Sequence, residues 1–167
     1  MTPDALRKVL TASDAEAIMV QGVEMLATRS RQVLDAVAEG VYLLDRDGRT
    51  LFVNAEGARL LGYSARELIG QPQHTLIHHS HPDGSPHAIE ECPIHHAVTE
   101  GVQQRVGGDV FWRKDRSALP VDYTAIPIRD GRTILGAVVT FREARGQTAA
   151  PEEPTLEAER ERETDES

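Results

Sequence analysis

The residues best suited to chemistry gather in one segment of this 167-residue chain. All seven histidines and the single cysteine lie between residues 74 and 96. Two pairs stand out there, His78-x-x-His81 and Cys92-x-x-His95. Imidazole and thiolate suit zinc or iron, and a two-residue gap lets both members of a pair reach one ion. One hypothesis is therefore a tetrahedral metal site formed by His78, His81, Cys92 and His95.

Cys92 could instead act as a nucleophile. It precedes Pro93 at the expected start of a helix, a position that lowers the pKa of a thiol. However, the sequence identifies no orienting acid and no oxyanion donor for it. Gly107-Gly108 is not followed by the Lys-Ser/Thr of a phosphate loop, and no G-x-S-x-G elbow occurs. We therefore expect no enzymatic activity.

Charge and composition limit the class of protein. The formal net charge is −9, and the eight acids and two arginines after residue 150 contribute −6 of it, which leaves −3 for the rest. This balance gives no basic face for nucleic acid. One cysteine excludes an intrachain disulfide, and no run of apolar residues is long enough to span a membrane. We expect a cytoplasmic protein without membrane contact.

The elements that must position these residues begin with a helical region from Thr2 to Glu39. Apolar residues recur there at three- and four-residue steps, and Ser13 with Glu16 has the spacing of a capping box. One helix could therefore end near Thr11 and another begin near Ser13. The apolar stripe could pair with the same helix of a second chain or fold back on the chain's own sheet.

The segment from Val41 to Gly70 predicts a hairpin and two short helices. Strands are expected at Val41–Leu44 and Thr50–Val53, joined by the turn Asp45-Arg46-Asp47-Gly48. Asn54 can cap the first helix, which Gly62 ends, and Ser64 with Glu67 has capping-box spacing for the second helix. A further helix is expected from Ile89 to Glu100. Three strands should follow, at Gln103–Lys114, Leu119–Ile128 and Ile134–Phe141, with a bulge near Gly107-Gly108.

This order of elements resembles a PAS domain over residues 33–143. The residues that carry the resemblance are spread along the hairpin and the two short helices: Asp45, Asp47, Gly48, Phe52, Asn54, Ala55, Ala58, Leu61, Gly62, Tyr63, Glu67, Leu68 and Gly70. The resemblance implies an α+β PAS fold, a five-stranded antiparallel sheet with helices on one face. A helical extension at residues 1–32 and a disordered acidic tail at residues 144–167 would flank it.

The resemblance also implies a function. PAS domains are sensory or protein-interaction modules in intracellular signal transduction. We expect a homodimer formed through the N-terminal helix, which passes a ligand- or partner-induced change to a separate histidine kinase or transcription regulator. Asn54 would act as a hinge, and Trp112 is interpreted as a strand residue that packs on the N-terminal helix.

The cofactor stays open, and a module without one is the favoured interpretation. The loop H-x-x-P-D-G-x-P followed by E-C-P-I resembles a loop that caps the pocket of many PAS domains without a metal. In haem-binding PAS domains a histidine of the helix before the third strand ligates the iron, a role open to His95 or His96. Small sheet residues could leave a pocket for the haem: Val121, Ala125, Ile134, Ala137 and Val139. The alternative function is a haem- or metal-binding redox or gas sensor that uses residues 74–96. The cysteine motif of flavin photoswitches is absent, and a noncovalent flavin stays open.

Overall fold

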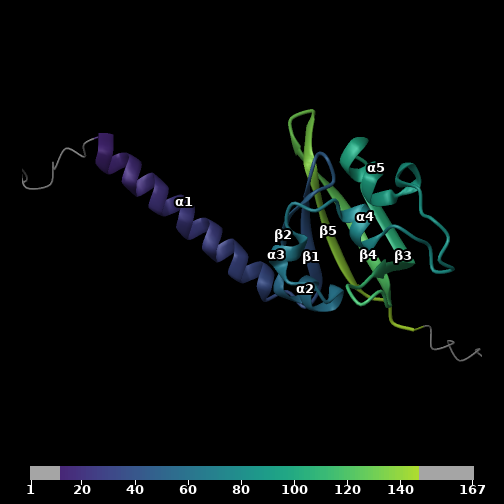
Figure 1. Ribbon diagram of the computed structural model, residues 1–167. Coiled ribbons are helices and arrows are strands. Elements are labelled where there is room, and N and C mark those ends of the chain that lie inside the picture. Colours follow the sequence, from purple (N-terminus) through teal and green to yellow (C-terminus); the bar gives the residue numbers. More distant parts are fainter. Residues whose placement is uncertain (1–11, 147–167) are drawn as a thin grey trace, which may run out of the picture.

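The computed structural model describes residues 12–146, with side chains from Glu16 onward. A five-stranded antiparallel sheet in the order β2-β1-β5-β4-β3 forms the centre of the fold. Short helices cover one face of this sheet, while the long helix α1 projects away from it (Figure 1). The predicted five-stranded sheet with helices on one face is therefore confirmed.

All five expected strands are present. They are β1 (Gly40–Asp45), β2 (Thr50–Val53), β3 (Gln104–Trp112), β4 (Ala118–Asp130) and β5 (Thr133–Glu143). Strands β4 and β5 are longer than their apolar runs, because their pairing continues to Asp130 and Thr133 at the hairpin turn. Leu119, Val121 and Tyr123 alternate with more exposed neighbours along β4, as a sheet with one buried face requires.

The expected bulge interrupts β3 between Val106 and Asp109, where the pairing with β4 shifts register. Gly108 takes a φ of 71°, which favours glycine, and its N–H donates to Asp122 Oδ1 over 3.0 Å. Asp109 follows directly after this irregularity. Its partly buried carboxylate reaches His78, which lies on the helical side of the sheet.

The helices over the sheet are short and are ended by identifiable residues. They are α2 (Ala55–Leu61), α3 (Ala65–Leu68), α4 (Gln73–Ile77), the 3-10 helix η2 (Ile89–Glu91) and α5 (Pro93–Thr99). Asn54 caps α2, Gly62 ends it in the left-handed conformation, and Ser64 with Glu67 forms the expected capping box. Helix α4 was not predicted. The single helix expected from Ile89 to Glu100 is divided, because Cys92 has an extended backbone before Pro93.

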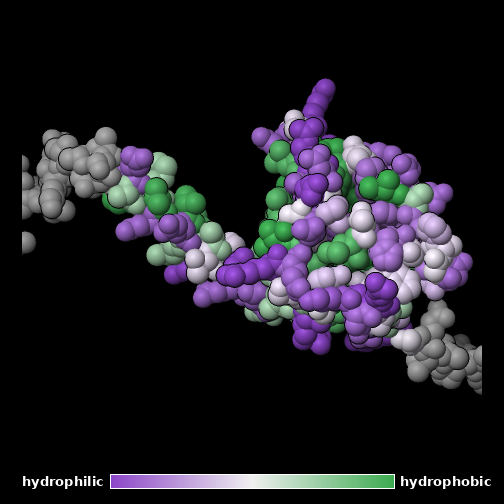
Figure 2. Space-filling view, viewed as in Figure 1, coloured by the Kyte–Doolittle hydropathy of each residue, from purple (hydrophilic) through white to green (hydrophobic). Residues whose placement is uncertain are grey.

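Helix α1 (Ala12–Asp35) does not fold back on the sheet. Every side chain from Glu16 to Val33 is exposed. Figure 2 shows hydrophobic side chains along this isolated helix. Only its C-terminal end meets the domain, where the Arg31 guanidinium lies 5.5 Å from the centre of the Phe52 ring. Residues 1–11 and 147–167, including most of the predicted acidic tail, lie outside the described residues. Among the described helices, none has the length and apolar character to cross a membrane.

The interior between helices and sheet is filled by aromatic side chains. Tyr42, Phe111 and Phe141 are buried, and the Tyr42 and Phe141 ring centres lie 5.7 Å apart. The small residues that could have left a pocket for haem are packed in this same core, with the exception of the partly exposed Ile134. Large rings from β1, β3 and β5 pack beside these small residues and fill the interior that a haem would need.

The contact between β1 and β5 predicts a sensitive position at Gly136. A Cβ there would lie 1.9 Å from the carbonyl oxygen of Leu44, which is backbone and cannot rotate away. We expect Gly136→Ala to lower the free energy of unfolding by about 1–3 kcal/mol or more, measured by urea denaturation. Gly107→Ala is the control, because its Cβ would meet only Asp122 Oδ1, at 3.4 Å. Equal unfolding midpoints for the two variants would contradict this account.

Candidate functional site

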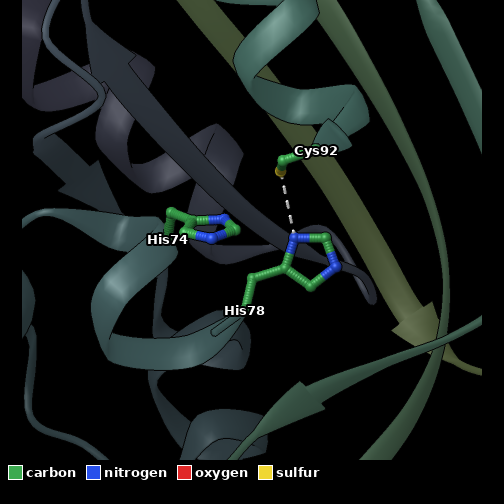
Figure 3. Close-up of side chains that lie close together, drawn as sticks. All are labelled: His74, His78 and Cys92. Atoms are coloured by element: carbon green, nitrogen blue, oxygen red, sulfur yellow. Dashed lines mark hydrogen bonds between the residues drawn. The ribbon is translucent and has the colours of Figure 1, made fainter. Parts of the chain in front are cut away.

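Three potential ligands meet between helices α4 and α5. His74 lies on α4 and His78 follows its last residue, so their four-residue spacing brings both side chains to one side of the helix. Cys92 is the extended residue that joins η2 to α5. Figure 3 shows the His78 ring and the Cys92 sulfur facing each other, with His74 beside them. One donor atom from each residue lies within 4.8 Å of the other two.

His78 is the centre of a hydrogen-bonded row. Its Nδ1 lies 3.3 Å from Cys92 Sγ, and its Nε2 lies 2.9 Å from Asp109 Oδ2. The hydroxyl of Tyr123 donates to the same carboxylate oxygen over 3.2 Å. His78 is fully buried and Cys92 is 1% exposed. A thiol, an imidazole and a carboxylate therefore lie in sequence inside the protein.

This row shifts the pKa values of its members. Burial lowers the pKa of His78, but its bonds to Asp109 and Cys92 and their charges outweigh burial and raise the pKa to about 9. Burial raises the pKa of the Cys92 thiol, but its contacts with His74 and His78 and the charge on His78 outweigh burial and lower the pKa to about 6. Both shifts favour a thiolate beside an imidazolium over a neutral thiol beside a neutral imidazole.

More histidines surround this row. Nε2 of His74 lies 2.9 Å from the carbonyl oxygen of His87, and the His78 and His87 ring centres are 4.5 Å apart. The Nδ1 atoms of His74 and His87 are buried and have no hydrogen-bond partner in the described part of the chain. Burial lowers the pKa of His87, and the nearby charges of His78, His81 and His74 lower it further. His87 is therefore more readily neutral than an ordinary histidine.

A cavity connects this cluster to the surface. It has a volume of about 290 Å³, and its lining includes His74, Cys92 and His95. Leu44, Ile94 and Val98 supply apolar wall. A small ligand could therefore approach the cluster from solvent.

The structure brings together only part of the predicted four-ligand set. His78 and Cys92 meet, whereas His81 and His95 are not in the group of converging donors. His81 follows α4 in the loop and packs against His87, with ring centres 4.5 Å apart. His74 takes part in their place. The sequence did carry a signal for it, because His74-x-x-x-His78 is the spacing of two residues on one helical face.

Trp112 and His96 have partners of their own. Trp112 Nε1 donates to the carbonyl oxygen of Ser80 over 2.9 Å, and its ring stacks on His79. It does not pack on α1 as predicted, because it lies on the edge strand β3, beside the loop after α4. Nε2 of His96 lies 2.6 Å from the carbonyl oxygen of Glu90. His96 therefore folds back on its own segment.

Asn54 joins three elements through its buried side chain. Its Oδ1 accepts from Val41 N–H at the start of β1 and from Gly57 N–H in α2, over 2.8 and 2.9 Å. Its Nδ2 donates to the carbonyl oxygens of Leu34 in α1 and of Glu39, over 2.8 and 2.9 Å. Asn54 thus connects the base of α1 with the sheet.

The ion pair at His78 predicts a pH-dependent signature. Asp109→Asn removes the carboxylate charge that raises the pKa of His78, so the Cys92 thiolate loses its imidazolium partner and its pKa should rise from about 6. Thiolate formation should then begin at higher pH than in the wild type. It can be followed by ultraviolet absorbance, with Cys92→Ser as the blank.

The control for this titration is Asp122→Asn. Asp122 interacts with Gly108 and Arg142, outside the row at His78. The variant Asp122→Asn should leave the titration of Cys92 unchanged. Superimposable curves for Asp109→Asn and the wild type would contradict the assignment of Asp109.

Comparison with known proteins identifies the family to which this fold belongs. The sequence model of the PAS fold family matches residues 28–144. No curated protein matches the chain. Among solved structures, a PAS domain from Colwellia psychrerythraea shares 24% identity with a TM-score of 0.57, covering 71% of this chain and 96% of that one.

Two further solved structures come from signalling proteins. The PAS domain of nitrogen regulation protein NR(II) from Vibrio parahaemolyticus is 19% identical, with a TM-score of 0.53 over 68% of this chain and 96% of that one. A domain of a sensory box sensor histidine kinase/response regulator from Geobacter sulfurreducens is 16% identical, with a TM-score of 0.54 over 72% and 96% of the two chains. With the fold, the capped helix at Asn54 and the family match all in agreement, the chain belongs to the PAS family.

Proposed function

We propose that this PAS protein is a sensory and interaction module of intracellular signal transduction. PAS domains are typical of signalling proteins such as histidine kinases. In this proposal residues 33–143 respond to a ligand or partner, and the extension at residues 1–32 carries the response to a separate histidine kinase or transcription regulator. Such partners act inside the cell, so we place the protein in the cytoplasm. In this scheme the module has no enzymatic activity of its own.

The observation that carries the proposal is the connection at Asn54. Its side chain is fully buried and holds Leu34 O of α1 and Val41 N of β1 at the same time. A second bond lies beside it, where Ala55 N–H donates to Asp35 Oδ1 over 2.8 Å. Because a buried polar group left unpaired costs about 1–3 kcal/mol, movement of β1 or α2 favours a matching movement of α1.

Helix α1 also has the pattern of a dimer interface. Met19, Val23, Leu26 and Val33 recur at coiled-coil spacing, with Ser30 at the one polar position of the seam. Val23, Leu26 and Val33 are 61%, 68% and 66% exposed. An apolar seam of this length in water favours association. We propose that a second copy of the chain covers it, giving a parallel pair that can transmit changes in α1.

A sensor that uses residues 74–96 is the second candidate, and the convergence of His74, His78 and Cys92 favours it. The site fits haem poorly. His95 borders the cavity of about 290 Å³, but Tyr42, Phe111 and Phe141 fill the interior that would receive a macrocycle. The donors suit a single small ion better.

Charge placed in the seam should separate the chains. Val23→Glu combined with Leu26→Glu puts four carboxylates in the interface of a dimer, so we expect monomers by analytical ultracentrifugation. Gln21→Glu combined with Thr28→Glu is the control, because it adds the same charge to the opposite face of α1. The control should remain dimeric. A dimeric seam variant, or a monomeric wild type, would contradict the proposed interface.

A further inference from the structure

His74 and His78 each use Nε2 for a hydrogen bond to a group other than Cys92, and Nδ1 of His78 faces Cys92 Sγ over 3.3 Å. Nε2 of His78 is held by Asp109, and Nε2 of His74 by the carbonyl oxygen of His87. Each ring can therefore offer Nδ1. Nδ1 of His74 is buried and has no hydrogen-bond partner among residues 12–146. A buried lone pair without a partner is costly, and a cation placed between the donors would satisfy it.

We propose that His74 Nδ1, His78 Nδ1 and Cys92 Sγ bind one divalent transition-metal ion of the zinc type. Two imidazoles and a thiolate form a donor set that zinc prefers. The nitrogen and sulfur donors of a tetrahedral zinc site lie about 3.5 Å apart. His78 Nδ1 and Cys92 Sγ are already 3.3 Å apart, and one ligand atom from each of the three residues lies within 4.8 Å of the other two. Binding of an ion would draw the His74 ring toward this pair.

The hydrogen-bond partners of His74 and His78 are of the kinds that orient metal-binding histidines in known sites. A metal-binding histidine usually donates its other ring N–H to a carboxylate or a backbone carbonyl, which fixes the ring and its tautomer. His78 has Asp109 in this position, and His74 has the carbonyl oxygen of His87. Tyr123 donates to Asp109 in turn. When the ion binds, the proton held between Cys92 and His78 is released to solvent.

Three protein ligands leave one tetrahedral position for an exchangeable ligand. The cavity of about 290 Å³ borders His74 and Cys92 and opens toward solvent. Sites with three protein ligands and an open position bind water or a small molecule there. This site therefore takes an ion that stays accessible to small ligands of the cell.

The first experiment uses cobalt(II) on the reduced full-length wild type. Cobalt in a site with a thiolate gives a sulfur-to-metal charge-transfer band, and Cys92 is the only thiol in the chain. We expect this band to saturate at one equivalent of cobalt. Cobalt bound without the band, or no cobalt bound, would overturn the proposal. This result needs no substitution and so does not depend on the folding of a variant.

The second experiment measures zinc affinity by competition with a chromophoric chelator. Asp109→Asn should weaken zinc binding about 10–100-fold through the orientation of His78. Cys92→Ser should lose stoichiometric zinc. His79→Gln combined with His96→Gln is the control, because these histidines lie outside the converging group, and it should match the wild type. Wild-type affinity in Cys92→Ser, or loss of zinc in the control, would overturn the site.

This inference is independent of the interface along α1. A monomeric wild type that binds zinc through Cys92 would contradict the dimer and leave the metal site intact. A dimeric wild type that gives no cobalt–thiolate band would contradict the metal site and leave the dimer interface intact.

Discussion

The side chain of Asn54 is the interaction on which the arrangement of this protein depends. One amide accepts two backbone N–H groups and donates to two carbonyl oxygens, entirely out of contact with water. It starts α2, fixes the first residues of β1 and holds the last turn of α1. No aliphatic residue of the same size could replace it without leaving several buried backbone groups unpaired, each at a cost of about 1–3 kcal/mol. The direction in which α1 leaves the domain is therefore set by a polar contact.

A continuous set of contacts leads from the histidine cluster to this amide. Gln73, next to His74 in α4, donates through Nε2 to the Tyr42 hydroxyl over 2.8 Å. Tyr42 follows Val41 in β1, and the N–H of Val41 donates to Asn54 Oδ1. A change that moves α4 therefore meets β1 through a buried hydrogen bond before it reaches α1. Contiguity of this kind is a structural basis for coupling between the cluster and α1.

The sequence predicted the elements whose signals are local. Asn54, Gly62 and the Ser64–Glu67 capping box act within a few residues, so the hairpin and the first two helices were predicted close to their observed bounds. Helix α4 was missed because it is short and follows a proline. The partner of His78 was also beyond the sequence, because Asp109 lies 31 positions away and reaches it only through the register shift in β3. Likewise, Tyr42, Phe111 and Phe141 meet in the core because of the order of the strands in the sheet. The spacing of these residues along the chain does not predict that order.

The measurement that tests the account most directly is amide hydrogen exchange of the full chain with Asn54→Ala, compared with Leu60→Ala. Leu60 is a buried residue of α2, so Leu60→Ala should destabilise the domain without removing a contact at the base of α1. If Asn54 couples α1 to the sheet, Asn54→Ala should accelerate amide exchange at residues 34–41 far more than in the β4–β5 hairpin. Leu60→Ala should instead accelerate exchange in both regions to a similar extent. Exchange at residues 34–41 that is unchanged, or that follows the same pattern in both variants, would contradict the central claim.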